Sequence, residues 1–226
     1  MRFLPGLFEN LAGHVDGVVA LDDQSTDGSA ELVAAHPLVV ELVRVPPGEQ
    51  GELEDGKNHR TLIEAALAHS PDWLLGIDAD ERVERAFRER ARREIEQAEA
   101  AGHDAVWVRF RELWGAPDRF RVDGIWGQKR KACLFKARRD HRFDDRRVHA
   151  IWASRSDDAA DWPQGDLVLY HLRMIRAEDR AARVERYRRM DPDNIWQEIG
   201  YDYLLDERGM QLSGPEPGRD YRPLGR

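Results

Sequence analysis

Two aspartates near the centre of the first half of the chain, Asp78 and Asp80, have the spacing of a metal-binding pair. They follow the apolar run at 73–77, which has the length of a buried strand. In an extended chain, side chains two residues apart point to the same face, so the two carboxylates would converge at the end of this strand. Oxygen ligands of this kind suit Mg²⁺ or Mn²⁺ bridged to a phosphate. The alternative is that both residues only end the strand and cap the next helix.

A second acidic group follows an earlier apolar run. Residues 17–21 read as a continuous strand and lead directly into Asp22 and Asp23. The segment that starts at Asp23 does not fit a calcium loop, because its twelfth residue is Ala34, where a bidentate Glu is needed. The sequence therefore predicts acidic side chains directly after each of two strands.

The elements that must position these residues alternate along the first third of the chain. After a helix at 1–11, periodicity predicts a strand at 17–21, a helix from about Ser29, a strand at 39–45, a helix at 57–69 and a strand at 73–77. The acidic segment at 49–56 is expected to be a mobile loop. Such alternation forms a parallel sheet that binds ligands at the carboxyl ends of its strands. We therefore expect an α/β fold with both acidic groups on one edge.

The later segments carry a weaker signal. They predict helices at 84–101 and 176–190, and strands at 105–113, 131–136 and 166–170. The basic residues 129–131 predict a solvated loop, or else a contact with a phosphate or a lipid-linked acceptor. We expect one domain over 1–208, followed at 209–226 by an extended tail that lies on the surface or is partly disordered.

Composition excludes several classes of protein. The chain has 226 residues, a formal net charge of -8 and a pI near 5.5, which argues against a nucleic-acid-binding surface. Its single cysteine, Cys133, cannot support an internal disulfide or a cysteine zinc site. The sequence has no apolar run of membrane-spanning length and does not begin with a signal-peptide pattern. We expect a protein without a transmembrane segment, located in the cytoplasm, including its membrane surface.

Together, these residues resemble the glycosyltransferase family 2 nucleotide-sugar-binding domain, which has the GT-A fold. Residues 18–29 are similar to the family's strand-end motif, and Lys57-Asn58 falls where the family has Arg-Asn near the diphosphate. Residues 78–81 occupy the position of its metal-binding Asp-x-Asp motif. The resemblance covers roughly 3–110 and implies a Rossmann-like, mostly parallel sheet flanked by helices, with an irregular acceptor-side C-terminal half.

The resemblance also implies a role for each of these residues. Asp78 and Asp80 would hold Mn²⁺ or Mg²⁺ against the diphosphate of a UDP- or GDP-linked donor sugar. Asp22 or Asp23 would accept hydrogen bonds from the nucleobase or ribose. Lys57 would add a fixed positive charge near the diphosphate, unless it is a solvated residue at the start of a helix.

The acceptor half, expected at 111–208 after a nucleotide-binding half at 1–110, carries the remaining candidates. The inverting mechanism that the resemblance implies needs a general base, for which the candidates are Asp123, Asp144 and Asp145. His171 follows a predicted strand and is either a third metal or phosphate ligand or a buried histidine. The acceptor would be the hydroxyl of a carbohydrate or of a lipid-linked molecule.

One departure from the family concerns the start of the chain, because family members have a strand before the helix at 1–11. Either the polypeptide begins further upstream or this is a truncated form. Metal-dependent sugar transfer is the leading hypothesis, and a non-catalytic remnant that binds a nucleotide or a partner protein is the alternative. An aspartate-nucleophile phosphohydrolase fits less well, because such enzymes carry the Asp-x-Asp motif on their first strand.

Overall fold

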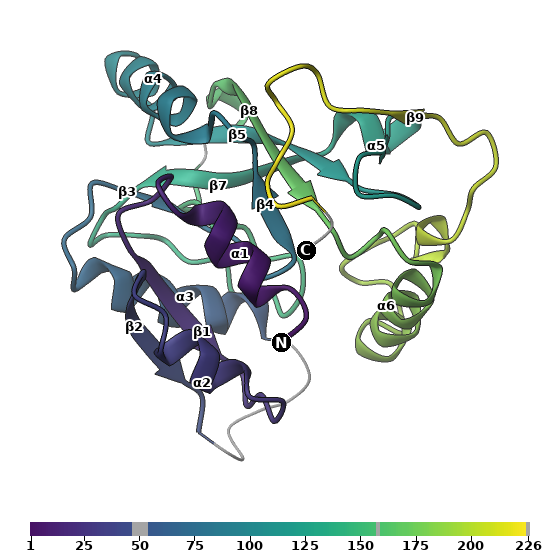
Figure 1. Ribbon diagram of the computed structural model, residues 1–226, viewed down its shortest axis with the longest axis horizontal. Coiled ribbons are helices and arrows are strands. Elements are labelled where there is room, and N and C mark those ends of the chain that lie inside the picture. The colour runs from purple at the N-terminus through teal and green to yellow at the C-terminus, as the bar shows by residue number, and fades with distance from the viewer. Residues whose placement is uncertain (47–53, 157–158, 225–226) are drawn as a thin grey trace.

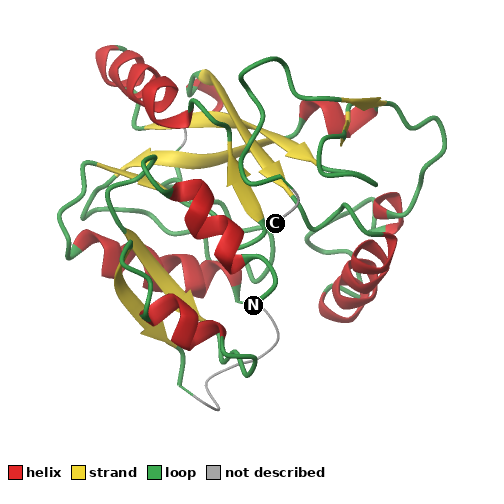
Figure 2. Ribbon diagram, viewed as in Figure 1, coloured by secondary structure: helices red, strands yellow, loops and turns green. Residues whose placement is uncertain are grey.

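The computed structural model describes residues 1–46, 54–156 and 159–224, in which helices pack around β-sheets (Figures 1 and 2). The helices are α1 (Leu4–Leu11), α2 (Ser29–Ala34), α3 (Asp55–Leu67), α4 (Phe87–Ala100), α5 (Gly124–Gln128) and α6 (Ala177–Met190). The strands are β1 (Val18–Asp22), β2 (Val39–Arg44), β3 (Trp73–Leu75), β4 (Glu81–Val83), β5 (Ala105–Glu112), β6 (Phe120–Arg121), β7 (Arg130–Lys136), β8 (Gln164–His171) and β9 (Leu212–Ser213). Most of the loop predicted at 49–56 lies outside the described residues. Within them, no helix is both long and apolar enough to span a membrane.

Strands β1 and β2 form a parallel two-stranded sheet, as the alternation of strands and helices predicted. From Val19, which lies opposite Glu41, the pairing continues to Asp22, which lies opposite Arg44. Helix α2 connects the two strands, and α3 packs against β1. The first acidic group of the sequence is therefore at the carboxyl end of β1, where ligands of parallel sheets bind.

A five-stranded sheet with the order β3-β7-β5-β8-β4 forms the centre of the molecule. Only β5 and β8 are parallel, and the other three neighbouring pairs are antiparallel. Apolar residues of these strands, including Val106, Leu134 and Leu169, are buried together in the main core. In the view of Figure 1, α4 lies above this sheet, whereas α3 and the β1–β2 pair lie below it.

The prediction of one mostly parallel sheet is therefore right for β1 and β2 but wrong for β3. Within the described residues, β3 pairs with β7 alone, in antiparallel fashion, with Trp73 opposite Lys136 and Leu75 opposite Leu134. After β3 the chain reverses through a turn into β4, which pairs antiparallel with β8. The α/β class is observed, but the central sheet is mixed.

The C-terminal segment packs tightly against the sheet instead of lying loosely on the surface. Strand β9 pairs with β6. Arg219 is buried and donates hydrogen bonds to both carboxylate oxygens of Glu84 at 2.8 Å. Tyr221 is fully buried, and its hydroxyl donates a hydrogen bond to the Pro117 carbonyl at 2.8 Å. Residues 209–224 thus belong to the folded structure, because their buried side chains complete its polar and apolar packing.

Candidate functional site

Asp78 lies at the edge of a charged cluster that is centred on Lys131. The Lys131 Nζ of β7 lies 2.6 and 2.8 Å from the two Glu81 carboxylate oxygens and 3.0 Å from Asp78 Oδ2. The Glu81 side chain is 2% exposed, whereas that of Asp78 is 55% exposed. Desolvation works to raise the pKa of Asp78, but the charge of Lys131 brings it below its ordinary value. Lys131 is therefore an internal cation, and the prediction that it belongs to a solvated loop was wrong.

Asp80 contacts a second group of charged side chains, around the end of β8. Its Oδ2 accepts a hydrogen bond from Arg173 Nε at 2.8 Å and lies 3.4 Å from His171 Nε2. The other ring nitrogen of His171, Nδ1, lies 2.5 Å from Glu112 Oε2. Lys129 donates a hydrogen bond to the other Glu112 oxygen at 2.8 Å. Because Glu112 and His171 are paired across β5 and β8, the register of the sheet fixes the orientation of the imidazole.

The two carboxylates around His171 hold its imidazole in the protonated form. Burial works to lower the pKa of His171, but the charges of Glu112 and Asp80 raise it to about 9. Desolvation works to raise the pKa values of Asp80 and Glu112, yet their cationic partners keep both below the ordinary range. At neutral pH the arrangement is therefore an imidazolium between two carboxylates.

Asp78 and Asp80 do not converge as they would on an extended strand. Strand β3 already ends at Leu75, and the Glu81 N–H donates a hydrogen bond to the Asp78 carbonyl at 3.0 Å. This turn directs the two carboxylates to different partners, so the predicted paired geometry was wrong. In the described part of the chain, no three His, Cys, Asp or Glu side chains are grouped closely enough to hold a metal ion.

The donor set still has the chemistry of a divalent cation site. Asp80 and His171 offer an oxygen and a nitrogen atom 3.4 Å apart, and Glu112 holds the far ring nitrogen. A carboxylate on the far nitrogen is the usual outer partner of a metal-ligating histidine. Asp78 could become a third ligand if its half-exposed side chain turned away from Lys131. The set fits Mn²⁺ better than Mg²⁺, because imidazole is a poor ligand for Mg²⁺, and binding would require His171 to lose its proton.

Three of the four residues predicted to bind the nucleotide beside the first strand come together. Asn58 of α3 hydrogen-bonds the carboxylate of Asp23, whose pKa is raised by burial and by the neighbouring Asp22. Asp22 Oδ1 also accepts the Ser25 N–H at 3.4 Å, so this residue helps to end the strand. Lys57 is exposed in the first turn of α3. The end of β1 therefore presents two carboxylates and one amide.

The three predicted general bases are all bound by arginines: Asp123 by Arg121, Asp144 by Arg146 and Asp145 by Arg60. Asp123 also accepts the Gln211 N–H, which ties it to the C-terminal segment. Asp144 is buried, whereas the Asp145 side chain is 77% exposed. The loop that carries the latter two closes over the start of α3, because the Arg146 and Arg147 carbonyls accept its first N–H groups.

Several charged residues of the cluster were not predicted as site residues: Glu81, Glu112, Arg173, and Arg183, whose Nη1 lies 3.4 Å from His171 Nε2. The sequence carried one signal, since Glu112 is next to the end of the strand predicted at 105–113 and His171 directly follows the strand predicted at 166–170. Their contact depends on which strands are neighbours in the sheet, and the periodicity of a single segment does not contain this information.

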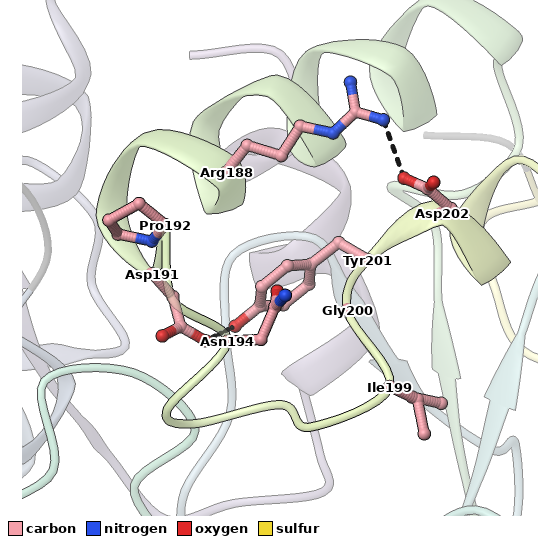
Figure 3. A pocket seen from close by; sticks show the side chains of 8 residues that line it. All are labelled: Arg188, Asp191, Pro192, Asn194, Ile199, Gly200, Tyr201 and Asp202. Carbon is pink, nitrogen blue, oxygen red and sulfur yellow. Dashed lines mark hydrogen bonds and ion pairs between the residues drawn. The ribbon is translucent and has the colours of Figure 1, made fainter.

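A separate hollow of about 360 Å³ lies at the C-terminal end of α6 (Figure 3). Its wall includes Asp191, Tyr201 and the ion pair between Arg188 and Asp202. The Asp191 carboxylate accepts the Tyr201 hydroxyl at 2.8 Å and two backbone N–H groups, so it serves to hold this loop. None of the residues that line the hollow belongs to the charged cluster, whose interior is filled by the Lys131 side chain.

Comparison with known proteins identifies relatives without a described activity. No protein-family model matches the chain. An uncharacterised protein of Mycobacterium bovis and one of Mycobacterium tuberculosis are each 27% identical over 220 residues, which cover 91% of this chain and 53% of each relative. The chain thus spans about half the length of the curated relatives it matches.

Proposed function

We propose that the protein is a metal-dependent glycosyltransferase of the GT-A type, which transfers a sugar from a nucleotide diphosphate to an acceptor hydroxyl with inversion. The observation that carries the proposal is the pair formed by Asp80 and His171, 3.4 Å apart. Glu112 holds Nδ1 of the imidazole and so presents Nε2 to the carboxylate. The two residues come from the turn after β3 and from the end of β8, so this arrangement requires the folded chain.

The end of β1 supports a nucleotide site. Asp22 and Asp23 supply acceptors of the kind that bind ribose hydroxyls or a nucleobase edge, and Asn58 orients the second carboxylate. These residues lie at the carboxyl end of a parallel strand pair, the usual position of a nucleotide in α/β proteins. We propose a UDP- or GDP-linked sugar as the donor.

The chemistry requires the leaving diphosphate to be stabilised while the acceptor loses a proton. Bound Mn²⁺ or Mg²⁺ would act there as a Lewis acid, held by Asp80 and His171 with Asp78 as a further ligand. As the acceptor oxygen bonds to the anomeric carbon, the bond from that carbon to the phosphate oxygen breaks, and a base takes the hydroxyl proton. We propose Asp145 as this base, because it is the exposed carboxylate of the loop beside α3. The acceptor would be a carbohydrate or a lipid-linked molecule.

Calorimetric titration of UDP- and GDP-sugars, with and without Mn²⁺, tests the proposal. We expect one donor series to bind only with Mn²⁺, and Asp80→Asn to weaken that binding roughly tenfold or more, since it removes a charged ligand. Asp140→Asn is the matched control, because the Asp140 side chain is 70% exposed and pairs with surface Arg138. Absence of binding, or binding that Asp80→Asn leaves unchanged, would count against a donor site here.

A non-catalytic nucleotide-binding protein is the second candidate, and the cations that contact Asp78 and Asp80 favour it. Lys131 and Arg173 already neutralise Asp78 and Asp80, the two carboxylates expected to hold the metal. Such a protein would bind a nucleotide without needing a divalent cation. Sugar transfer to any acceptor that is lost in Asp80→Asn would exclude this candidate.

A further inference from the structure

Helix α6 and the residues before it bring three arginines to the side of the cluster that contains Asp80. Arg173 is paired with Asp80 through a 2.8 Å hydrogen bond. Arg183 and Arg186, one turn apart on α6, are different: among the described residues, neither has a carboxylate within ion-pairing distance. Both side chains are only partly exposed, so water does not fully solvate their charges. Among the described residues, two partly buried guanidinium groups therefore have no carboxylate in direct contact, although the more distant charges of Glu112 and Asp80 stabilise that of Arg183.

The contacts that hold these two guanidinium groups leave donors free. Arg183 donates to the Tyr187 hydroxyl through Nε at 3.2 Å and Nη2 at 3.0 Å. Its Nη1 lies 3.4 Å from Nε2 of His171, so two cationic side chains face each other there. The guanidinium of Arg186 lies 6.0 Å from the centre of the Tyr187 ring. Burial lowers the pKa of Arg186, and the charges of Arg173 and Arg183 lower it further, so both of these groups lie close enough to Arg186 to repel it, whereas the charge of Asp80 attracts it.

We propose that Arg183 and Arg186 form an oxyanion subsite for the diphosphate of the donor, beside Asp80 and His171. This assignment rests on the proposed function. A diphosphate would supply the missing acceptors, because its oxygens match the planar fork of a guanidinium group and its charge removes the repulsion between the arginines. The two arginines would supply the positive charge near the diphosphate that was expected of Lys57, whose side chain is exposed on a different helix. It also places positive charge where the leaving group develops negative charge.

Inorganic pyrophosphate in metal-free buffer is the probe, because it contains the diphosphate without the nucleoside or the sugar. We expect calorimetry to detect binding to the native protein, and Arg186→Gln and Arg183→Gln each to weaken it roughly tenfold or more. Arg188→Gln is the matched control on the same helix, because the Arg188 side chain is 56% exposed and pairs only at the surface with Asp202. Arg186→Gln removes no hydrogen bond that the structure shows, so the folded protein should remain available even if Arg183→Gln unfolds.

The outcomes separate this inference from the proposed function. If pyrophosphate does not bind the native protein, or binds Arg186→Gln as tightly as Arg188→Gln, the subsite is wrong. If a nucleotide sugar binds in a way that depends on Mn²⁺ and Asp80, but Arg186→Gln leaves its affinity unchanged, the donor site is supported and the subsite is wrong. If pyrophosphate binding depends on both arginines while no nucleotide sugar binds, the subsite stands and the glycosyltransferase proposal falls.

Discussion

Replacing Lys131 with Met should destabilise the protein severely, because it removes the only cation that contacts Glu81 through a side chain in the described structure. Both Glu81 oxygens accept from Lys131, and Oε2 also accepts the Asp78 N–H at 3.0 Å, so the carboxyl group is placed as an ionised acceptor. Burial nevertheless raises the pKa of Glu81 to about 8 despite the ammonium. Without Lys131, Glu81 would be a buried and unpaired carboxylate wherever it is ionised, so the loss should be largest above pH 8.

The expected loss can be estimated from the burial of each partner. The Glu81 side chain is 2% exposed and that of Lys131 is 19% exposed, and breaking a buried ion pair on one side costs roughly 3–5 kcal/mol. Lys136→Met on the same strand is the control, since its pair with Glu99 is about half exposed and such pairs contribute at most about 1 kcal/mol. Asp78 adds little to the loss, because its exposed side chain can be solvated.

Urea unfolding followed by tryptophan fluorescence measures these free energies. The double variant Lys131→Met/Glu81→Gln should recover much of the lost stability, because it leaves no buried charge. The loss of unfolding free energy in Lys131→Met should be largest above the Glu81 pKa of about 8 and should shrink as the pH falls through that value, because Glu81 then takes up a proton and becomes neutral. Equal losses in Lys131→Met and Lys136→Met, or no recovery in the double variant, would refute the view that Lys131 acts as the counter-ion of Glu81.

Further predictions concern pH, close packing and the C-terminal segment. Burial lowers the pKa of His149 from 6.5 to about 4, so the unfolded protein binds a proton more readily than the folded one between these pH values. The free energy of unfolding should therefore fall by up to about 3 kcal/mol from this residue as the pH drops from 6.5 towards 4. Urea unfolding at both pH values should show a smaller fall in His149→Asn, because Asn also accepts the positive φ of 59°. Gly56→Ala should lower the melting temperature, because the new Cβ would lie 2.3 Å from a backbone oxygen of the loop over α3, and such overpacking costs about 1–3 kcal/mol. Arg219→Met should lower the free energy of unfolding by roughly 3–5 kcal/mol, because Glu84 stays buried without its bidentate partner. In the same chemical denaturation experiment the control Arg222→Met should have nearly the native free energy of unfolding, since the Arg222 side chain is 59% exposed.

Much of the fold could be predicted because periodicity is a local property. The strand predicted at 131–136 is observed as Arg130–Lys136, and the helix predicted at 176–190 is observed as Ala177–Met190. The parallel pairing of β1 with β2 also followed, since a helix between two strands requires a crossover. Sheet neighbours are a long-range property, so the antiparallel pairing of β3 with β7 could not be derived from the apolar run at 73–77.

The candidate site was predictable to a similar extent. Asp80 and His171 were identified because each follows a predicted strand, and the fold brings them together. The turn after Asp78 was missed, because an Asp-x-Asp pattern is compatible with both an extended strand and a reversal. Lys131 begins the strand predicted at 131–136, but its contact with Glu81 was missed because the basic residues 129–131 favour an exposed position and the sequence does not show which acidic residue lies opposite.

The internal ion pairs decide which carboxylate can change partners. Glu81 can retain Lys131 without help from Asp78, because it contributes both oxygens at 2.6 and 2.8 Å. Asp78 is bound by a single hydrogen bond of 3.0 Å and is half exposed, so it can rotate away without leaving a buried charge unpaired. On the other side, Arg173 is 38% exposed and can leave Asp80, while Glu112 keeps the imidazole of His171 in place. A divalent cation could therefore be accommodated by moving the Asp78 and Arg173 side chains and removing the proton from His171, while the Glu81–Lys131 and Glu112–His171 contacts stay in place.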